Sequence, residues 1–366
     1  EGIPRSRFYQ AFSREGRERL DTLMPKILQQ CLASEYPDTA LTRSIFLIQS
    51  IGRRSAYLAL LSENPLALSQ LVRLVCASSE ISQWIAKHPV ILDELLDPIA
   101  TFQVKDRLEI TQELRTKMER AETDLEAGME VLREFRQAYT LRVAAADIAG
   151  LIDTKTVALS LSALASALLD ESLKLAEATL DTVERPSDID LGIIAYGKLG
   201  SEELGYHSDL DIVFVFDESS ESENTELSAR RHYYRRLVQR LTHILTTRTS
   251  AGEVYEIDTR LRPSGNSGTV VTPLRVYAEY LKESAWTWEH QALVRAQLVV
   301  GHEHLQRQFR DIRRVILSQP RDNKKLHQDL CQMRQRMRDH HRSEHASIVD
   351  FDLKHDPGGL IDIEFL

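Results

Sequence analysis

The fold of this chain is decided by one stretch, Gly197-Lys198-Leu199-Gly200-Ser201-Glu202-Glu203-Leu204-Gly205-Tyr206-His207-Ser208-Asp209-Leu210-Asp211-Ile212-Val213-Phe214-Val215-Phe216. A glycine-punctuated turn leads into two carboxylates, Asp209 and Asp211, at the head of an apolar strand. Side chains two residues apart on a strand point to the same side, about 7 Å from each other. Two acids placed in this way suit Mg²⁺ together with phosphate oxygens. The stretch therefore predicts a magnesium site, although an isolated Asp-x-Asp pair is also compatible with a solvated turn.

The residues before the turn strengthen the magnesium interpretation. Leu191-Gly192-Ile193-Ile194-Ala195-Tyr196 is an apolar run of strand length that ends at Gly197. Gly200 and Gly205 allow backbone amides to approach an anion closely. A strand, a glycine turn and an acidic strand in this order favour a protein that handles nucleotides.

A third segment, Glu253-Val254-Tyr255-Glu256-Ile257-Asp258-Thr259-Arg260-Leu261-Arg262-Pro263, alternates apolar and charged residues. The alternation predicts a half-buried strand whose charged face carries Asp258, Arg260 and Arg262. Asp258 can supply a third metal carboxylate or polarise an incoming hydroxyl, and the two guanidiniums suit capture of phosphate oxygens. An edge strand with solvated ion pairs is the alternative.

These segments together carry a resemblance. The order of strand, Gly-x-x-Gly turn, Asp-x-Asp pair and later lone aspartate resembles the DNA polymerase β-like nucleotidyltransferase superfamily. More narrowly, the chain is similar to the glutamine synthetase adenylyltransferase family in four blocks: Gly197 to Gly200 with Ser208 to Asp211, Asp258 to Pro263, Trp286-Thr287-Trp288-Glu289, and Gly358-Gly359-Leu360-Ile361-Asp362-Ile363-Glu364-Phe365. The family carries two catalytic modules in one chain, one that removes AMP by phosphorolysis and one that attaches it. The sequence around Tyr255, Pro263 and Trp286 resembles that of the attaching, C-terminal module.

The resemblance implies a function and a set of site residues. The module would transfer AMP from ATP to a tyrosine hydroxyl of glutamine synthetase, release pyrophosphate and use two Mg²⁺ ions. The metal and catalytic residues would be Asp209, Asp211 and Asp258. The nucleotide would be bound by Gly197, Lys198, Gly200, Ser208, Arg260 and Arg262. Many superfamily members have serine where this chain has Lys198, so a positive charge replaces a hydroxyl there. A PII-type signal protein is implied as a partner of the full-length chain.

The pattern along the chain predicts an α+β fold in two domains. Apolar residues recur at helical spacing through the first 180 or so positions, and strands begin after Glu184-Arg185-Pro186-Ser187-Asp188. We expect a helical region over residues 1–185 and a nucleotidyltransferase domain with a small mixed sheet over 186–366, which returns to helix beyond Thr272. Because the chain stops inside an apolar segment at Leu366, we expect the second domain to be truncated at its C-terminal end.

Composition narrows the functional classes. A formal net charge of -9 argues against general binding of nucleic acid, which needs a basic surface. The cysteines Cys31, Cys76 and Cys331 are too scattered for a disulfide framework, which favours a reducing compartment. No apolar run looks long enough to cross a membrane. We therefore expect a cytoplasmic enzyme that does not bind membranes.

Three other functions remain open at this point. The chain could be the removing module, since the same metal site serves phosphorolysis of adenylyl-tyrosine to ADP. It could also be a regulatory module that binds nucleotide without turnover, which the presence of Asp209, Asp211 and Asp258 disfavours. A polymerase acting on RNA or DNA ends is disfavoured by the acidic charge.

Overall fold

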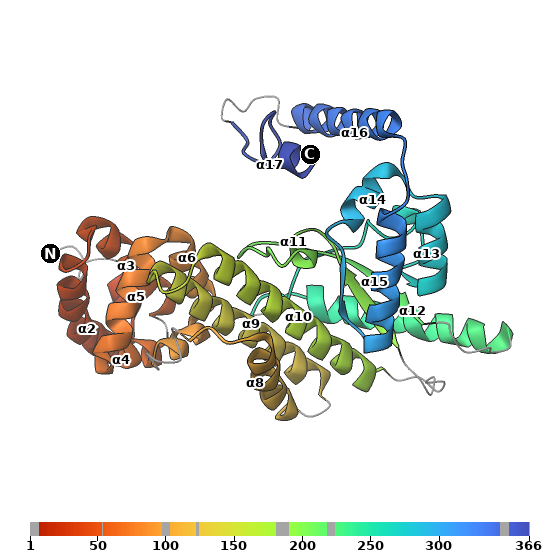
Figure 1. Cartoon of the computed structure of the whole chain (residues 1–366). Coiled ribbons are helices and arrows are strands. Elements are labelled where there is room, and N and C mark those ends of the chain that lie inside the picture. The colour runs from red at the N-terminus through yellow and green to blue at the C-terminus, as the bar shows by residue number, and fades with distance from the viewer. Residues whose placement is uncertain are drawn as a thin grey trace. The chain divides into compact units, whose positions relative to one another are not determined.

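Helices dominate the protein (Figure 1), and five short strands form one mixed sheet in the part of the chain that the structure describes. The structure is a computed structural model, and it describes residues 7–52, 54–96, 103–121, 124–180, 190–217, 224–249, 251–344 and 351–365. Within these ranges the helices come first, the strands begin at Leu191, and further helices follow. The predicted α+β class is confirmed.

The chain divides into two compact units. The first unit comprises Glu1–Thr179, Leu204–His207 and His243–Tyr255, and the second comprises Leu180–Glu203, Ser208–Thr242 and Glu256–Leu366. The predicted boundary near residue 185 falls within 181–189, which lie outside the described residues. The division at 185 therefore stays a prediction.

The first unit is helical, and its helices begin where the sequence supplies caps. Pro37 and Pro65 occupy the first turns of their helices, where the missing N–H costs no hydrogen bond. The Asp106 carboxylate accepts the Glu109 N–H in a capping box. The elements are α1 (Arg7–Gln10), α2 (Arg14–Leu32), α3 (Pro37–Ile51), α4 (Ser55–Glu63), α5 (Pro65–Ala77), α6 (Ser79–Lys87), the 3-10 segment η2 (Pro89–Leu96), α8 (Arg107–Glu119), α9 (Leu125–Ile148) and α10 (Thr154–Ala178).

Helix α10 corrects one expectation from the sequence. Its 25 residues are long and apolar enough to cross a membrane, contrary to the expectation that no such run exists. However, 72% of its most apolar window is buried inside the protein, and α8 and α9 pack along it (Figure 1). Burial of this kind is typical of a core helix, whose apolar surface is covered by its neighbours.

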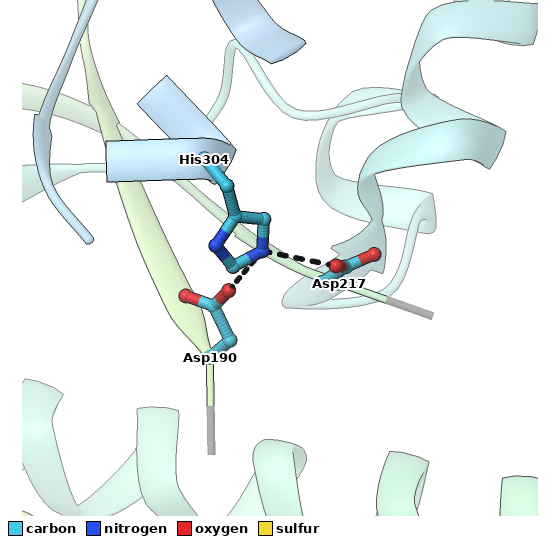
Figure 2. Close-up of side chains that lie close together, drawn as sticks. All are labelled: Asp190, Asp217 and His304. Atoms are coloured by element: carbon cyan, nitrogen blue, oxygen red, sulfur yellow. Dashed lines mark hydrogen bonds and ion pairs between the residues drawn. The ribbon is translucent and has the colours of Figure 1, made fainter. Parts of the chain in front are cut away.

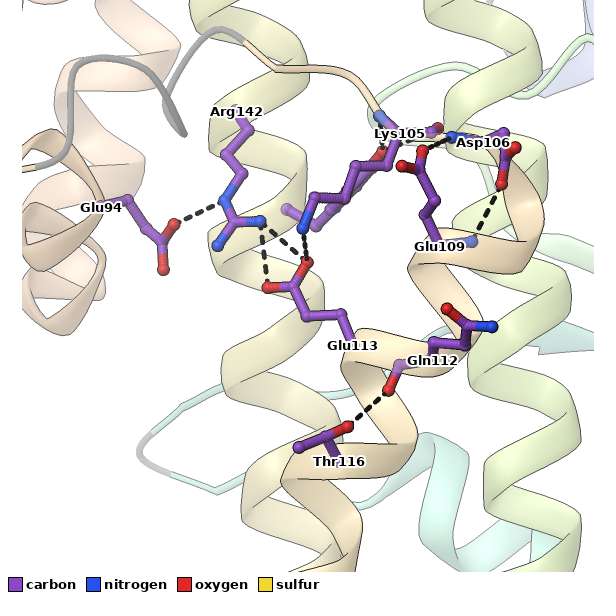
Figure 3. Close-up of polar contacts among 9 residues, drawn as sticks. Glu94, Lys105, Asp106, Glu109, Gln112, Glu113, Thr116 and Arg142 are labelled. Carbon is purple, nitrogen blue, oxygen red and sulfur yellow. Dashed lines mark hydrogen bonds and ion pairs between the residues drawn. The ribbon is translucent and has the colours of Figure 1, made fainter.

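A buried ionic network joins three elements of the first unit (Figure 3). Arg142 of α9 donates to Glu94 of η2 at 2.6 Å and to both carboxylate oxygens of Glu113 of α8 at 3.1 Å. Lys105 donates to the same Glu113 at 2.9 Å. The Arg142 side chain is only 9% exposed, yet its charge is balanced on both sides, which is the condition under which a buried ion is tolerated.

The second unit is built on the mixed sheet. Its strand order is β3-β2-β1-β5. Strand β4 also pairs with β2, nearer the C-terminal end of β2 than β3 does. Strand β2 runs antiparallel to β1 and parallel to both β3 and β4. The strands are β1 (Leu191–Ala195), β2 (Leu210–Phe216), β3 (Ile257–Asp258), β4 (Val271–Pro273) and β5 (Gln297–Val300). The remaining elements are α11 (Gly197–Gly200), α12 (Asn224–Thr246), the 3-10 turn η3 (Gly265–Ser267), α13 (Leu274–Glu283), α14 (Thr287–Leu293), α15 (Glu303–Leu317), α16 (Asn323–Glu344) and α17 (Leu360–Glu364).

Helices cover both faces of the central strands. Val213 and Val215 of β2 belong to an apolar cluster with Tyr277 of α13 and Phe309 of α15. On the other face Phe216 stacks on Tyr234 of α12, with ring centroids 4.4 Å apart. Because side chains alternate along a strand, Asp211 shares the face of Val213 and Val215. The strand is thus held rigidly just below its first carboxylate.

Two predicted elements differ from the structure. The strand predicted over 254–262 is reduced to β3, because the Asp258 carboxylate accepts the Arg260 N–H at 2.8 Å and turns the chain. The uninterrupted helical region predicted beyond Thr272 contains β5, which pairs with β1.

Candidate active site

The candidate site is organised by one pairing in the sheet. In the parallel register of β2 and β3, Asp211 lies directly opposite Asp258, and Leu210 lies opposite Ile257. Neighbouring strands are about 4.8 Å apart, and side chains at paired positions share a face. Two carboxylates separated by more than forty residues in the sequence are therefore brought side by side.

Asp209 adds a third negative charge. It directly precedes β2, and its side chain is exposed. Burial raises the pKa of Asp211, and the charges of Asp209 and Asp258 raise it further. Asp209 and Asp258 thus oppose the ionisation of Asp211, and a cation bound among the three carboxylates would relieve this repulsion.

The turn after β1 presses against this cluster. Gly197 has a φ of +53°, a conformation that favours glycine. A Cβ atom at this position would lie 2.5 Å from Asp211 Oδ2. The neighbouring Tyr196 N–H donates to the Asp211 carbonyl at 2.8 Å, which fixes the approach. The glycine is required both for the backbone conformation and for room beside the carboxylate.

The end of the turn is fixed by Arg295, a residue that the sequence analysis did not single out. A Cβ atom at Gly200 would lie 2.0 Å from the Arg295 carbonyl oxygen, so only glycine fits there. The Arg295 guanidinium donates to Ser201 Oγ at 2.9 Å, and it also pairs with Glu203 and Glu364. Arg295 therefore links the turn to the C-terminal segment.

The two predicted phosphate-binding arginines differ in their partners. Arg260 donates from Nε to Asp258 Oδ2 at 2.7 Å, and its hydrogen bonds hold the pKa of that carboxyl below its usual range. Arg262 donates from Nη1 to the Thr259 carbonyl at 2.9 Å. Its Nε is buried and finds no hydrogen-bond partner within the described part of the chain. Arg262 thus keeps an unused donor.

The other predicted nucleotide-binding residues lie in the same segment. Lys198 is exposed in α11, and Ser208 is half-buried immediately before Asp209. The structure brings the turn, Asp209, Asp211 and Asp258 to one edge of the sheet.

The C-terminal segment contributes both structure and charge. Asp362 pairs with Arg334 and Arg338 of α16, and the N–H of Gly358 together with these arginines holds the pKa of Asp362 far below its ordinary value. The charge of Lys354 acts on Asp211 and opposes the rise of its pKa. Neither the Arg334 pairing nor the effect of Lys354 is visible from the sequence.

Comparison with known proteins assigns the family. A profile of the glutamate-ammonia ligase adenylyltransferase family matches residues 68–312. The bifunctional glutamine synthetase adenylyltransferase/adenylyl-removing enzyme of Thioalkalivibrio sulfidiphilus is 46% identical over 364 residues, which cover 96% of this chain. The enzyme of the same name from Pseudomonas putida is 41% identical over 386 residues, which cover all of it. The chain belongs to the glutamate-ammonia ligase adenylyltransferase family.

The resemblance read from the sequence is thereby confirmed at the level of the family. The chain spans 37% and 40% of the length of these two relatives, whose names combine an attaching and a removing activity. The region that the family profile matches contains the whole site from Gly197 to Arg262.

Proposed function

We propose that this chain is the attaching module, which transfers AMP from ATP to a tyrosine hydroxyl of glutamine synthetase and releases pyrophosphate. The observation that carries the proposal is the register of β2 and β3, which sets Asp211 opposite Asp258 beside Asp209 and the Gly197 turn. The relatives' names supply glutamine synthetase as the acceptor and the two directions of the reaction.

The donor set fits Mg²⁺. Hard cations of this kind prefer carboxylate oxygens, and all three candidate ligands are aspartates. The pKa of Asp211 is raised by burial and by the other two acids, and a bound cation would relieve that repulsion. We propose that Asp209, Asp211 and Asp258 hold two Mg²⁺ ions. When bound, Mg²⁺ supplies Lewis-acid neutralisation of phosphate charge.

The chain's own groups would orient the nucleotide. Gly197 and Gly200 would let the backbone of α11 lie close to a phosphate. Lys198 brings an ammonium group to the same turn. The buried Nε–H of Arg262 has no acceptor among the described residues, and it could donate a hydrogen bond to an oxygen of a triphosphate. Arg260 would have to leave Asp258 when a cation arrives, and its side chain is exposed enough to do so.

The chemistry follows from this placement. The tyrosine oxygen forms a bond to the α-phosphorus, the bond between that phosphorus and the bridging oxygen of pyrophosphate breaks, and the phenolic proton is released. Asp258 would polarise the hydroxyl through its carboxylate. Lys198, Arg260 and Arg262 would stabilise the leaving pyrophosphate.

Direction is the point on which the two modules differ. Three cationic groups beside the acids offer more positive charge than one inorganic phosphate requires, which supports a pyrophosphate leaving group.

We further propose a cytoplasmic location, supported by the free thiols of Cys31, Cys76 and Cys331 in the described structure. Control by a PII-type protein would need the longer chain of the relatives.

The test is a transfer assay with α-labelled ATP, Mg²⁺ and unmodified glutamine synthetase. The proposal expects label on a tyrosine and release of pyrophosphate. Arg262→Ala should weaken ATP binding, because a lost charge-assisted bond is worth about 1.5 to 3 kcal/mol. Arg275→Ala is the matched control, since that exposed arginine pairs with Glu279 on the surface of α13.

The opposite outcome is equally specific. If the chain releases ADP from adenylylated glutamine synthetase only when phosphate is added, and forms no adduct from ATP, it is the removing module. Binding of ATP with neither reaction would indicate a regulatory module.

A further inference from the structure

A second cluster of acidic and imidazole side chains lies at the other end of the central strands (Figure 2). Asp190 directly precedes β1, and Asp217 directly follows β2. The antiparallel pairing of Leu191 with Phe216 sets the two aspartates opposite each other, and the Asp217 N–H donates to the Asp190 carbonyl at 3.2 Å. His304 points at both carboxylates from the first turn of α15.

One ring nitrogen of His304 approaches two carboxylates but can carry only one proton. His304 Nε2 lies 2.7 Å from Asp190 Oδ2 and 3.1 Å from Asp217 Oδ2. A ring nitrogen carries at most one proton and can donate it to one oxygen, and the geometry serves Asp217. Asp190 is 92% buried, being 8% exposed, and its Oδ2 finds no hydrogen-bond donor among the described residues. A buried carboxylate oxygen left in this state is costly.

We propose that Asp190, Asp217 and His304 bind a divalent transition-metal ion of the zinc class. One atom from each residue lies within 4.8 Å of the other two. Bonds of about 2.1 Å place the ligands of a tetrahedral ion roughly 3.4 Å apart, so the three atoms need only small shifts to enclose one. A mixed set of imidazole and carboxylates selects Zn²⁺ and similar ions over Mg²⁺ or Ca²⁺.

His302 lies outside the proposed ligand set and contacts one of its members. Its Nδ1 lies 3.4 Å from Asp190 Oδ1, the oxygen that His304 does not approach, and its ring stacks on that of His304. It can therefore orient Asp190 while the ion binds at Oδ2, a role that outer ligand partners commonly have.

The proposed ion would be structural and separate from the catalytic acids. Asp217 directly follows β2 and is six residues from Asp211, which corresponds to about 20 Å along an extended strand. The ion would join the start of β1, the end of β2 and the first turn of α15, three segments that are separated in the sequence. We expect it to raise thermal stability and to leave the chemistry of AMP transfer unaltered.

The test titrates the 366-residue chain with Zn²⁺ against a chromogenic zinc indicator. Millimolar Mg²⁺ is present to occupy the Asp209, Asp211 and Asp258 cluster. A Cys331→Ser background removes the exposed pair formed by Cys331 Sγ and His327 Nε2, 3.6 Å apart, which is a second place where zinc could bind. We expect one equivalent of tightly bound Zn²⁺ and a rise in melting temperature on its addition.

Variants decide whether the ion sits at the proposed residues. His304→Ala and the isosteric Asp190→Asn should each weaken Zn²⁺ binding at least tenfold and remove the rise in melting temperature. His207→Ala, which alters an exposed histidine paired with Glu80, should change neither measurement. Circular dichroism of the metal-free variants checks that they fold. Zinc binding that survives His304→Ala, or the absence of a bound equivalent in the Cys331→Ser chain, overturns the proposal.

Discussion

Replacing Gly197 by alanine should separate the stability of this protein from its activity. The φ of +53° strains any residue with a Cβ atom, at a cost of about 1 to 2 kcal/mol in the free energy of unfolding. The added Cβ would also lie 2.5 Å from Asp211 Oδ2, whereas ordinary contact begins at 3.4 Å. The carboxylate must therefore retreat by about 0.9 Å, the difference between these two distances.

This movement of the Asp211 carboxylate should disturb the fold little but slow the proposed reaction strongly. Oδ2 is at the end of a rotatable side chain, so it can move without displacing the backbone of β2. A misplacement of about 1 Å in a catalytic group costs on the order of a hundredfold in rate. We expect Gly197→Ala to lower kcat/KM for AMP transfer by about a hundredfold while the protein remains folded.

Gly150→Ala is the matched control for this experiment. Gly150 also has a positive φ, +69°, but a Cβ atom there would meet nothing within 4 Å. Both variants should lose a similar free energy of unfolding in denaturant titrations, and only Gly197→Ala should lose activity in the labelled-ATP assay. Unchanged activity in Gly197→Ala, or an equal loss in both variants, would refute the argument that this glycine makes room for Asp211.

Other substitutions test the charges. Asp211→Asn should reduce AMP transfer by about a thousandfold or more and yet raise the melting temperature, because it removes one of three opposing carboxylates; a drop in melting temperature would contradict this. Arg142→Ala should lower the free energy of unfolding by about 3 to 5 kcal/mol, since it removes the buried cation that two half-buried glutamates share, whereas Arg115→Ala, whose side chain is 54% exposed, should cost under about 1 kcal/mol in the same denaturation assay. Burial raises the pKa of Glu113, but Lys105 and Arg142 lower it more, to below its ordinary 4.5, so its contribution to stability is present above pH 4.5 and should be lost as the pH falls further; Glu113→Gln should flatten that part of the profile of melting temperature against pH.

The sequence predicts the centre of the site because the relevant signals are local. An apolar run, a Gly-x-x-Gly turn and an Asp-x-Asp pair follow one another within about thirty residues. The distant Asp258 joins them because α12 reverses the chain and returns it parallel to β2, and the apolar spacing of α12 is itself readable. The sequence predicts that Asp258 belongs to the site, whereas its alignment opposite Asp211 is known only from the register.

Other features depend on contacts that no local pattern encodes. The charged alternation after Tyr255 favours a longer strand, but the hydrogen bond from the Arg260 N–H to Asp258 ends it early. Strand β5 has only four residues, too few for periodicity to distinguish it from the helices on either side. Asp190, Asp217 and His304 converge only through the pairing of β1 with β2 and the placement of α15.

The acidic cluster at the sheet edge differs from the network around Arg142 in a way that supports its proposed role in binding a ligand. In the Arg142 network each carboxylate meets a cation at hydrogen-bond distance, as expected of buried charges that only support the fold. At the sheet edge three local rules are broken together: like charges lie opposite each other in register, a glycine adopts a positive φ against a carboxylate, and the buried Nε of Arg262 lacks an acceptor in the described structure. Each departure disfavours the isolated fold, and a cation with a triphosphate would relieve the repulsion and supply the missing acceptor. Departures from local rules that one ligand can resolve mark a binding site, because folding alone gives no reason to keep them.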